Sequence, residues 1–198
     1  DSNHIVKMKN TDRLCLFTAQ GNMYQVKAEK IPKCKIKDKG TLIHNLCKVD
    51  KEDILLYIAF EDLFESQLLF TTKNGFIKLV SGIEFETNRA MISATKLEEE
   101  DQVISVLCLS AHTISNPDSK VILLTEESLS LGFPLSEVSE LKKTSKGVKG
   151  ITLEKKDKVA FTTVALPETE NFKFNGKELS AKKVRNRKRG AKGQKANL

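Results

Sequence analysis

Three stretches of the chain repeat one pattern at a spacing of just over 50 residues. Each has an apolar run, a turn and a second apolar run, and the first run with its turn spans Leu14–Gly21, Leu68–Gly75 and Val121–Ser128. The turn residues Gly21, Gly75 and Ser128 lie 54 and 53 positions apart. A repeat of this length made of short strands is typical of radial or stacked β arrays, in which each unit packs mainly on its neighbours. Function should therefore be sought on a surface that recurs in every copy.

Short runs rich in β-branched and aromatic residues predict strands throughout the chain. These runs are Leu14–Thr18, Met23–Val26, Ile54–Ala59, Leu68–Thr72, Phe76–Val80, Val103–Leu109, Val121–Thr125 and Val159–Val164. Glycine between paired runs predicts hairpins, because glycine adopts positive φ at little cost. Ser128 replaces that glycine in the third copy and should strain or reshape its turn. Helical periodicity is weak, and only residues 61–67 and 135–141 predict helical turns.

Matching positions of the repeat predict a buried core. Leu16, Phe70 and Leu124 occupy one such position and should all be buried. The four cysteines, Cys15, Cys34, Cys47 and Cys108, form no CxxC pair, and most lie in apolar runs. They indicate small buried thiols, kept reduced in a cytoplasmic protein. No apolar run approaches the roughly 20 residues that span a bilayer, so we expect no membrane partner. The first residue is not Met, which suggests a fragment of a longer polypeptide.

Positive charge is concentrated at one end of the chain. The net charge is +7, from 33 Lys and Arg against 26 Asp and Glu. Residues 177–198 hold nine basic side chains and one acidic one, which leaves a net charge of −1 on the other 176 residues. Within that body, lysines gather at residues 27–39 and 142–149, and acids gather elsewhere. Charge sorted in this way suggests a positive surface for a polyanion.

Catalytic or metal-binding chemistry has little support in the sequence. His4, His44 and His112 are scattered, and none stands near a cysteine or aspartate at metal-ligand spacing. The chain has neither a P-loop nor a GxSxG string. Runs of acids such as residues 98–101 usually mark solvated turns. We therefore expect no cofactor, no metal and no catalytic residue in this chain.

The order of motifs along the three copies resembles a known family. The first copy reads GNMYQVKAEKIP from Gly21 and KDKGTLIHNL from Lys37, the second has Thr72, Gly75 and Lys78, and the third has FPLSEV from Phe133 and GVKGITL from Gly147. Over about residues 4–165 the chain resembles the C-terminal domain of bacterial type IIA topoisomerase A subunits, those of DNA gyrase and topoisomerase IV. The resemblance implies an all-β fold, a propeller-like β-pinwheel. It should have about three four-stranded blades, at residues 4–60, 61–115 and 116–166. Beyond the resemblance, the residues themselves predict a degenerate hairpin and a basic tail at residues 167–198, and the tail would be flexible alone.

The resemblance also implies a function without catalysis. The outer rim would bind and bend duplex DNA, largely independently of sequence, to position it for strand passage. One partner would be the catalytic core of the same A subunit. The other would be the ATPase B subunit, with ATP and magnesium used outside this domain. The strand-breaking tyrosine of these enzymes follows an arginine, whereas Tyr24 and Tyr57 follow Met23 and Leu56.

Seventeen basic residues are the predicted DNA contacts, because lysine and arginine neutralise phosphates without reading bases. The first group precedes or lies within the outer loop of the first copy: Lys27, Lys30, Lys33, Lys35, Lys37 and Lys39. The second group belongs to the second and third copies: Lys78, Arg89, Lys142, Lys143, Lys146 and Lys149. The third group is the tail: Arg185, Arg187, Lys188, Arg189 and Lys192.

Two departures from the family leave alternatives open. The body contains only Arg13 and Arg89 as arginines, and the gyrase box Gln-Arg-Arg-Gly-Gly-Lys-Gly does not occur. The sequence therefore does not separate a gyrase-like parent enzyme from a topoisomerase IV-like one. A propeller-like scaffold that binds proteins and not DNA is the alternative function, favoured by the near-neutral body and its acidic patches.

Overall fold

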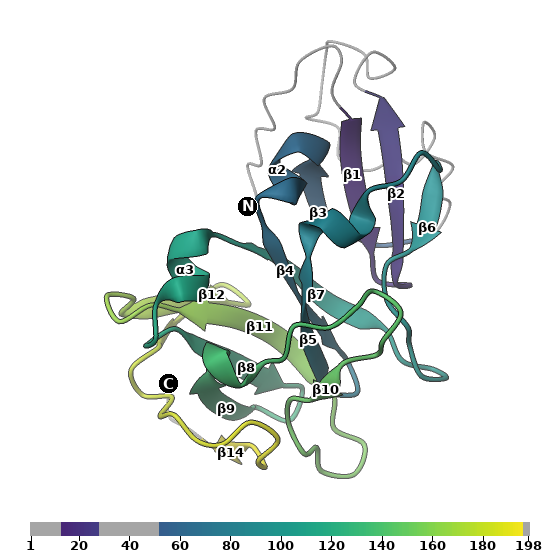
Figure 1. The fold of residues 1–198 in the computed structure, drawn as a ribbon. Coiled ribbons are helices and arrows are strands. Elements are labelled where there is room, and N and C mark those ends of the chain that lie inside the picture. The colour runs from purple at the N-terminus through teal and green to yellow at the C-terminus, as the bar shows by residue number, and fades with distance from the viewer. Residues whose placement is uncertain (1–12, 28–51, 196–198) are drawn as a thin grey trace.

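A computed structural model describes residues 13–27 and 52–195 of the chain. Within these residues the fold is all-β, as predicted, with antiparallel four-stranded sheets that follow one another along the chain (Figure 1). The first three sheets are called blades 1, 2 and 3 here. Among the described residues, no helix is long and apolar enough to cross a membrane.

Each blade is built around one hairpin of the repeat. Blade 1 has the strand order β3 (Ile54–Ala59), β1 (Arg13–Thr18), β2 (Asn22–Lys27), β6 (Met91–Ser93). Blade 2 has the order β10 (Val148–Lys149), β5 (Phe76–Ser81), β4 (Gln67–Thr72), β7 (Val103–Leu109). Blade 3 has the order β11 (Val159–Ala165), β8 (Lys120–Thr125), β9 (Leu129–Pro134), β14 (Gln194–Lys195). The short helical elements are α2 (Phe60–Phe64), η2 (Gly82–Phe85), α3 (Ala111–Ser115) and η3 (Leu135–Glu137).

One edge strand of each blade comes from the next repeat. Strand β6 joins blade 1 from the second repeat, β10 joins blade 2 from the third, and β14 joins blade 3 from the C-terminal segment. A blade is therefore not one contiguous segment. The predicted ranges 4–60, 61–115 and 116–166 describe units of sequence, and the sheets cross their boundaries. Sequence periodicity could not show this exchange, because the exchanged strands are only two or three residues long.

The turn of the hairpin has the same geometry in all three repeats. Gly21 and Gly75 have φ of 81° and 92°, and Ser128 has φ of 65° in the corresponding place. The turn N–H donates to the carbonyl of a threonine three residues earlier, at 3.0 Å in each copy. Ser128 keeps this turn, so of the expected strain or reshaping the structure shows strain, because the serine adopts a left-handed conformation that costs an L-residue roughly 1–2 kcal/mol.

Acidic turns between the strands cap the hairpins. Asp101 Oδ1 accepts hydrogen bonds from the backbone N–H of Asn74 and of Gln102, at 3.0 and 2.8 Å. Asp157 Oδ1 repeats this arrangement in the next blade with the N–H groups of Glu127 and Lys158, at 3.1 and 2.8 Å. Among the described residues, no group of three or more His, Cys, Asp or Glu could hold a metal ion. Asp101 and Asp157 accept hydrogen bonds from backbone N–H groups and therefore belong to the framework.

Apolar cores fill the space between successive blades. The rings of Phe17 and Phe85 meet edge to face at 5.0 Å between centroids, and Phe17 and Phe70 meet at 6.0 Å. Leu16, Phe70 and Leu124 are all buried, as predicted. The register matches Leu123, and not Leu124, to Leu16 and Phe70, because these three residues pair with Leu131, Tyr24 and Lys78, each three residues after the turn residue. Burial raises the pKa of the Cys15 thiol to about 12. Cys108 is exposed, contrary to the expected burial, and Cys34 and Cys47 lie outside the described residues.

The described part of the C-terminal segment, up to residue 195, packs against blade 3 and pairs with it. Strands β12 (Asn171–Phe174) and β13 (Lys177–Ser180) form the predicted hairpin. Its turn has positive φ at Asn175 and Gly176, 51° and 74°. Beyond it, Ala181 and Val184 are buried in an apolar cluster with blade 3. These two small apolar residues anchor a segment whose composition otherwise favours disorder.

Candidate nucleic-acid interface

Two basic segments cross from one repeat to the blade before it. The lysine loop, residues 142–149, leads from η3 to β10 at the edge of blade 2. The C-terminal segment, residues 181–195, leads from β13 to β14 at the edge of blade 3. Both segments therefore bring a series of cations to the edge of a rigid sheet.

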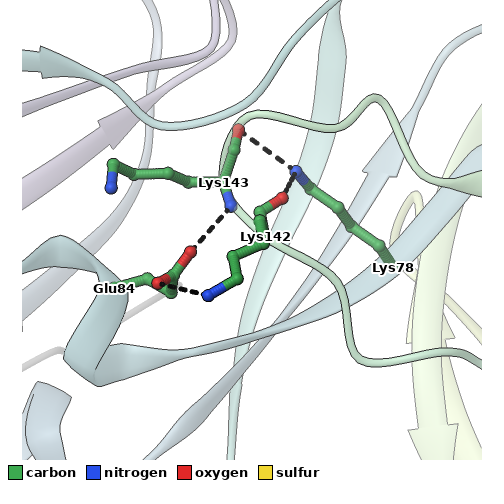
Figure 2. A network of polar contacts seen from close by, with 4 residues as sticks. All are labelled: Lys78, Glu84, Lys142 and Lys143. Atoms are coloured by element: carbon green, nitrogen blue, oxygen red, sulfur yellow. Dashed lines mark hydrogen bonds and ion pairs between the residues drawn. The ribbon is translucent and has the colours of Figure 1, made fainter.

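Lys78 of β5, one of the predicted DNA contacts, is buried in the framework. Its side chain is 1% exposed. Figure 2 shows its ammonium pointing into the lysine loop, where Nζ donates to the carbonyl oxygens of Lys142 at 2.9 Å and Lys143 at 3.4 Å. It also donates to the carbonyl oxygen of Ser145 at 2.5 Å. Burial lowers the pKa of Lys78 to about 8, against an opposing effect of Glu84, so the ammonium form still predominates at neutral pH.

The lysines of the lysine loop are accessible but have carboxylate neighbours. The Lys142 side chain is 80% exposed, and its Nζ lies 3.9 Å from Glu84 Oε2. Lys146 Nζ lies 2.6 Å from Glu98 Oε1 and 4.6 Å from the centroid of the Phe76 ring. Lys143 is half-buried and Lys149 is exposed. Four of the predicted contacts therefore lie together on one loop, two of them beside acids.

The C-terminal segment encloses a basic hollow with β9. The hollow has a volume of about 500 Å³, and none of its described lining residues is acidic. Its basic lining residues are Lys182, Lys183, Arg185, Arg187 and Lys195. Cations gathered without carboxylates repel one another, and an anion in the hollow relieves that repulsion.

Two of the predicted tail arginines also hold the segment in place. Arg189 donates through Nε to the Glu137 carbonyl oxygen and through a terminal nitrogen to the Lys149 carbonyl oxygen, each at 2.7 Å. Arg187 donates to the Lys192 carbonyl oxygen at 2.6 Å. Both guanidinium groups are thus partly engaged. Arg185, Lys188 and Lys192 are exposed, as a phosphate contact requires.

Blade 1 presents a smaller basic edge. Lys27 ends β2 and Arg89 precedes β6, and both are exposed. The two strands pair at this edge, where the N–H of Gln25 donates to the Ala90 carbonyl oxygen at 3.0 Å. The other predicted residues of this group lie outside the described residues: Lys30, Lys33, Lys35, Lys37 and Lys39.

A short motif marks the exchanged strands of blades 2 and 3. Residues 146–149 read Lys-Gly-Val-Lys and residues 192–195 read Lys-Gly-Gln-Lys. Glycine is needed there because an added Cβ would lie 2.7 Å from the Ile77 carbonyl oxygen at Gly147 and 2.8 Å from Leu129 Cβ at Gly193. Matching these two strings would have identified Lys195, which sequence reasoning missed together with Lys182 and Lys183.

Comparisons with known proteins agree with this architecture. The sequence matches the family model described as DNA gyrase C-terminal domain, beta-propeller, at residues 12–57, 66–110, 120–165 and 175–197. The last range shows that the C-terminal segment is part of a further copy of the repeat. The DNA gyrase A protein of Helicobacter pylori is 33% identical over 195 residues, which cover 93% of this chain and 23% of that protein. The corresponding gyrase protein of Staphylococcus aureus is 30% identical over 202 residues, 96% of this chain and 22% of that protein.

Solved structures share the fold. The crystal structure of the C-terminal domain of DNA topoisomerase IV has a TM-score of 0.80 at 24% identity, covering 94% of this chain and 59% of that one. The structure of the DNA gyrase A C-terminal domain has a TM-score of 0.65 at 25% identity, covering 94% and 60%. The chain spans less than a quarter of the length of the curated relatives it matches. The family match extends over most of its residues, and the chain therefore belongs to the family of DNA gyrase C-terminal β-propeller domains.

Proposed function

We propose that this chain binds and bends duplex DNA along its basic outer edge, as a non-catalytic accessory domain of the A protein of a type IIA topoisomerase. The observation that carries the proposal is the strand exchange, which places basic residues at the same edge of successive blades. Arg89 lies at blade 1, the lysine loop at blade 2 and the C-terminal segment at blade 3. The function thus lies on a surface that recurs in every copy.

Binding through such a surface is electrostatic. Each phosphate neutralised by a lysine or arginine releases condensed counterions, so affinity falls steeply with salt. The proposed contacts reach phosphates and not base edges, so the domain discriminates little between sequences. Contact with about six phosphates gives a slope of log affinity against log salt near −5.

Bending follows from the rigidity of the blades. Paired strands and shared apolar cores fix each blade relative to the next. The basic strips are held at set positions, and a duplex that contacts all of them must follow their curve. Bending a site of 20–30 base pairs by 40–90° costs about 1–6 kcal/mol, which additional phosphate contacts offset.

The remaining machinery of the proposed enzyme lies outside this chain. One partner is the catalytic core of the same polypeptide, the other is the ATPase B protein of the enzyme, where ATP and magnesium act. The relatives by name are gyrase A proteins, and this chain matches a fraction of their length. A location in the cytoplasm, at the nucleoid, is part of the same proposal.

The alternative is a scaffold that binds proteins. Among residues 13–27 and 52–195, two large apolar side chains are exposed, Ile83 by 60% and Met91 by 48%, and such residues occur in protein interfaces. Two side chains make a small apolar surface for a protein interface, which favours the DNA proposal. A gel shift with several duplexes of unrelated sequence separates the two. DNA binding predicts comparable shifts for all duplexes, weakened by salt, whereas a protein scaffold gives no shift at any salt concentration.

A further inference from the structure

Two lysines hold the exchanged segments, each from a strand of the receiving blade, and of these Lys78 is buried and Lys120 is half-buried. Lys78 of blade 2 donates to three carbonyl oxygens of the lysine loop. Lys120 of blade 3 donates to the carbonyl oxygens of Ala181 and Val184 in the C-terminal segment, at 2.7 and 2.6 Å. Burial lowers the pKa of Lys120 as well. In both blades an ammonium group, with its three N–H donors, fastens backbone that arrives from another repeat.

Other groups around Lys78 also form hydrogen bonds with the backbone of the lysine loop. The Ser145 carbonyl oxygen also accepts from Thr95 Oγ1 at 3.1 Å and from the Lys96 N–H at 3.2 Å. Glu84 faces the same loop, and its Oε1 accepts from the Lys143 N–H at 3.3 Å. The loop is therefore pinned from blade 2 and from the chain that follows β6. The carbonyl oxygens of Lys142 and Lys143 point towards the Lys78 ammonium, whereas the Lys142 side chain points towards Glu84 and the Lys143 side chain points away from Lys78 (Figure 2).

We propose that Lys78 is a positioning residue of the DNA-binding edge, which acts by holding the lysine loop on blade 2, and that Lys120 does the same for the C-terminal segment on blade 3. The DNA part of this inference rests on the proposed function. The loop-holding part does not, because the contacts are intramolecular. Burying an ammonium is costly, and carbonyl partners compensate for it. A buried lysine contributes little to the packing of a strand core. It can, however, hold a loop in one conformation through hydrogen bonds to its carbonyl oxygens.

Lys78→Met tests the proposal in the whole chain, because methionine has a similar length and no donors. Lys73→Met, in the same hairpin, is the matched control, because it removes one charge from a side chain that is not buried in the loop. We expect amide exchange at Lys143 and Ser145 to become at least tenfold faster in Lys78→Met and to stay unchanged in Lys73→Met. Exchange in β4 and β5 should stay slow in both variants, which separates loop release from general destabilisation.

DNA measurements on the same variants test the positioning role. Lys78→Met should reduce bending of a short duplex, measured by end-to-end energy transfer, by more than Lys73→Met does. Unchanged exchange in the loop of a folded Lys78→Met protein overturns the proposal. If that variant does not fold, Lys120→Met and exchange across residues 181–187 apply the same criterion to blade 3. If the wild-type chain binds no DNA while the loop is released as expected, the proposed function fails and the anchoring role stands.

Discussion

The lysine loop and the C-terminal segment both cross to a preceding blade, but their charges meet different surroundings. In the lysine loop, Lys146 lies 2.6 Å from Glu98 and Lys142 lies 3.9 Å from Glu84. In the C-terminal segment, five basic residues line one hollow that has no acidic residue among its described lining. A carboxylate beside a lysine competes with a phosphate for it. The number of basic residues in a segment is therefore a poor measure of its affinity for DNA. Whether carboxylates lie beside those residues matters more.

The largest effect should come from neutralising the hollow. The triple variant Lys182→Gln, Lys183→Gln, Arg185→Gln removes three exposed cations and leaves the buried Ala181 and Val184 in place. The slope of log affinity against log salt should become less steep by about 2.7 units, and affinity at 0.1 M salt should fall roughly a hundredfold or more. Fluorescence anisotropy of a labelled duplex from 50 to 200 mM salt measures both. An unchanged slope would remove the C-terminal segment from the interface.

Neutralising the paired lysines of the loop should have a smaller effect. In the double variant Lys142→Gln, Lys146→Gln, each lost cation already lies beside a carboxylate. The slope of log affinity against log salt should therefore change by less than about 1.8 units, the value for two phosphates. Relative to the wild-type chain, the bend of the duplex should decrease by a larger fraction than the affinity for it, because the loop is held rigidly on blade 2. The same anisotropy titration, with energy transfer across the duplex, checks this. A greater loss per charge than in the hollow variant would reverse the comparison.

Removing the competing acid should strengthen binding. Glu98→Gln frees Lys146, and since exposed ion pairs contribute about 0.2–1 kcal/mol, affinity should rise by up to about fivefold. Glu168→Gln is the matched control, because it removes an equal charge from an exposed residue elsewhere. If both variants gain equally, the gain reflects net charge alone and Glu98 does not compete for Lys146.

The smallest effect is on the stability of blade 3, which carries the hollow, and DNA binding should not change. Ser128→Gly relieves the left-handed strain at φ of 65° and should stabilise the fold by about 1 kcal/mol. Urea unfolding at constant m-value measures this gain. A loss of stability would mean that the serine contributes more to its turn than the glycines of blades 1 and 2 do.

The sequence predicted the repeated elements well, because each depends on local chemistry. The strands follow from runs of β-branched and aromatic residues, and Leu16, Phe70 and Leu124 within these runs are buried. The hairpin at Asn175 and Gly176 follows from residues that favour positive φ.

The remaining features depend on partners distant in sequence. Lys78 belongs to the motif of the second copy, but only the return of residues 142–145 to blade 2 gives its ammonium three carbonyl partners. The C-terminal segment looks disordered by composition, yet Ala181 and Val184 find an apolar site on blade 3. Strand exchange could not be inferred from a period, because β10 and β14 are two residues long.

The measurement that tests the central claim most directly is the bending of a short duplex by the whole chain, followed by end-to-end energy transfer as salt is raised. We predict that the duplex ends approach one another on binding and separate again with salt. We also predict a slope of log affinity against log salt near −5, for contact with about six phosphates. Duplexes of unrelated sequence should bind with similar affinity. Binding that leaves the duplex straight would contradict the bending claim, and the absence of salt-dependent binding would contradict the DNA-binding edge itself.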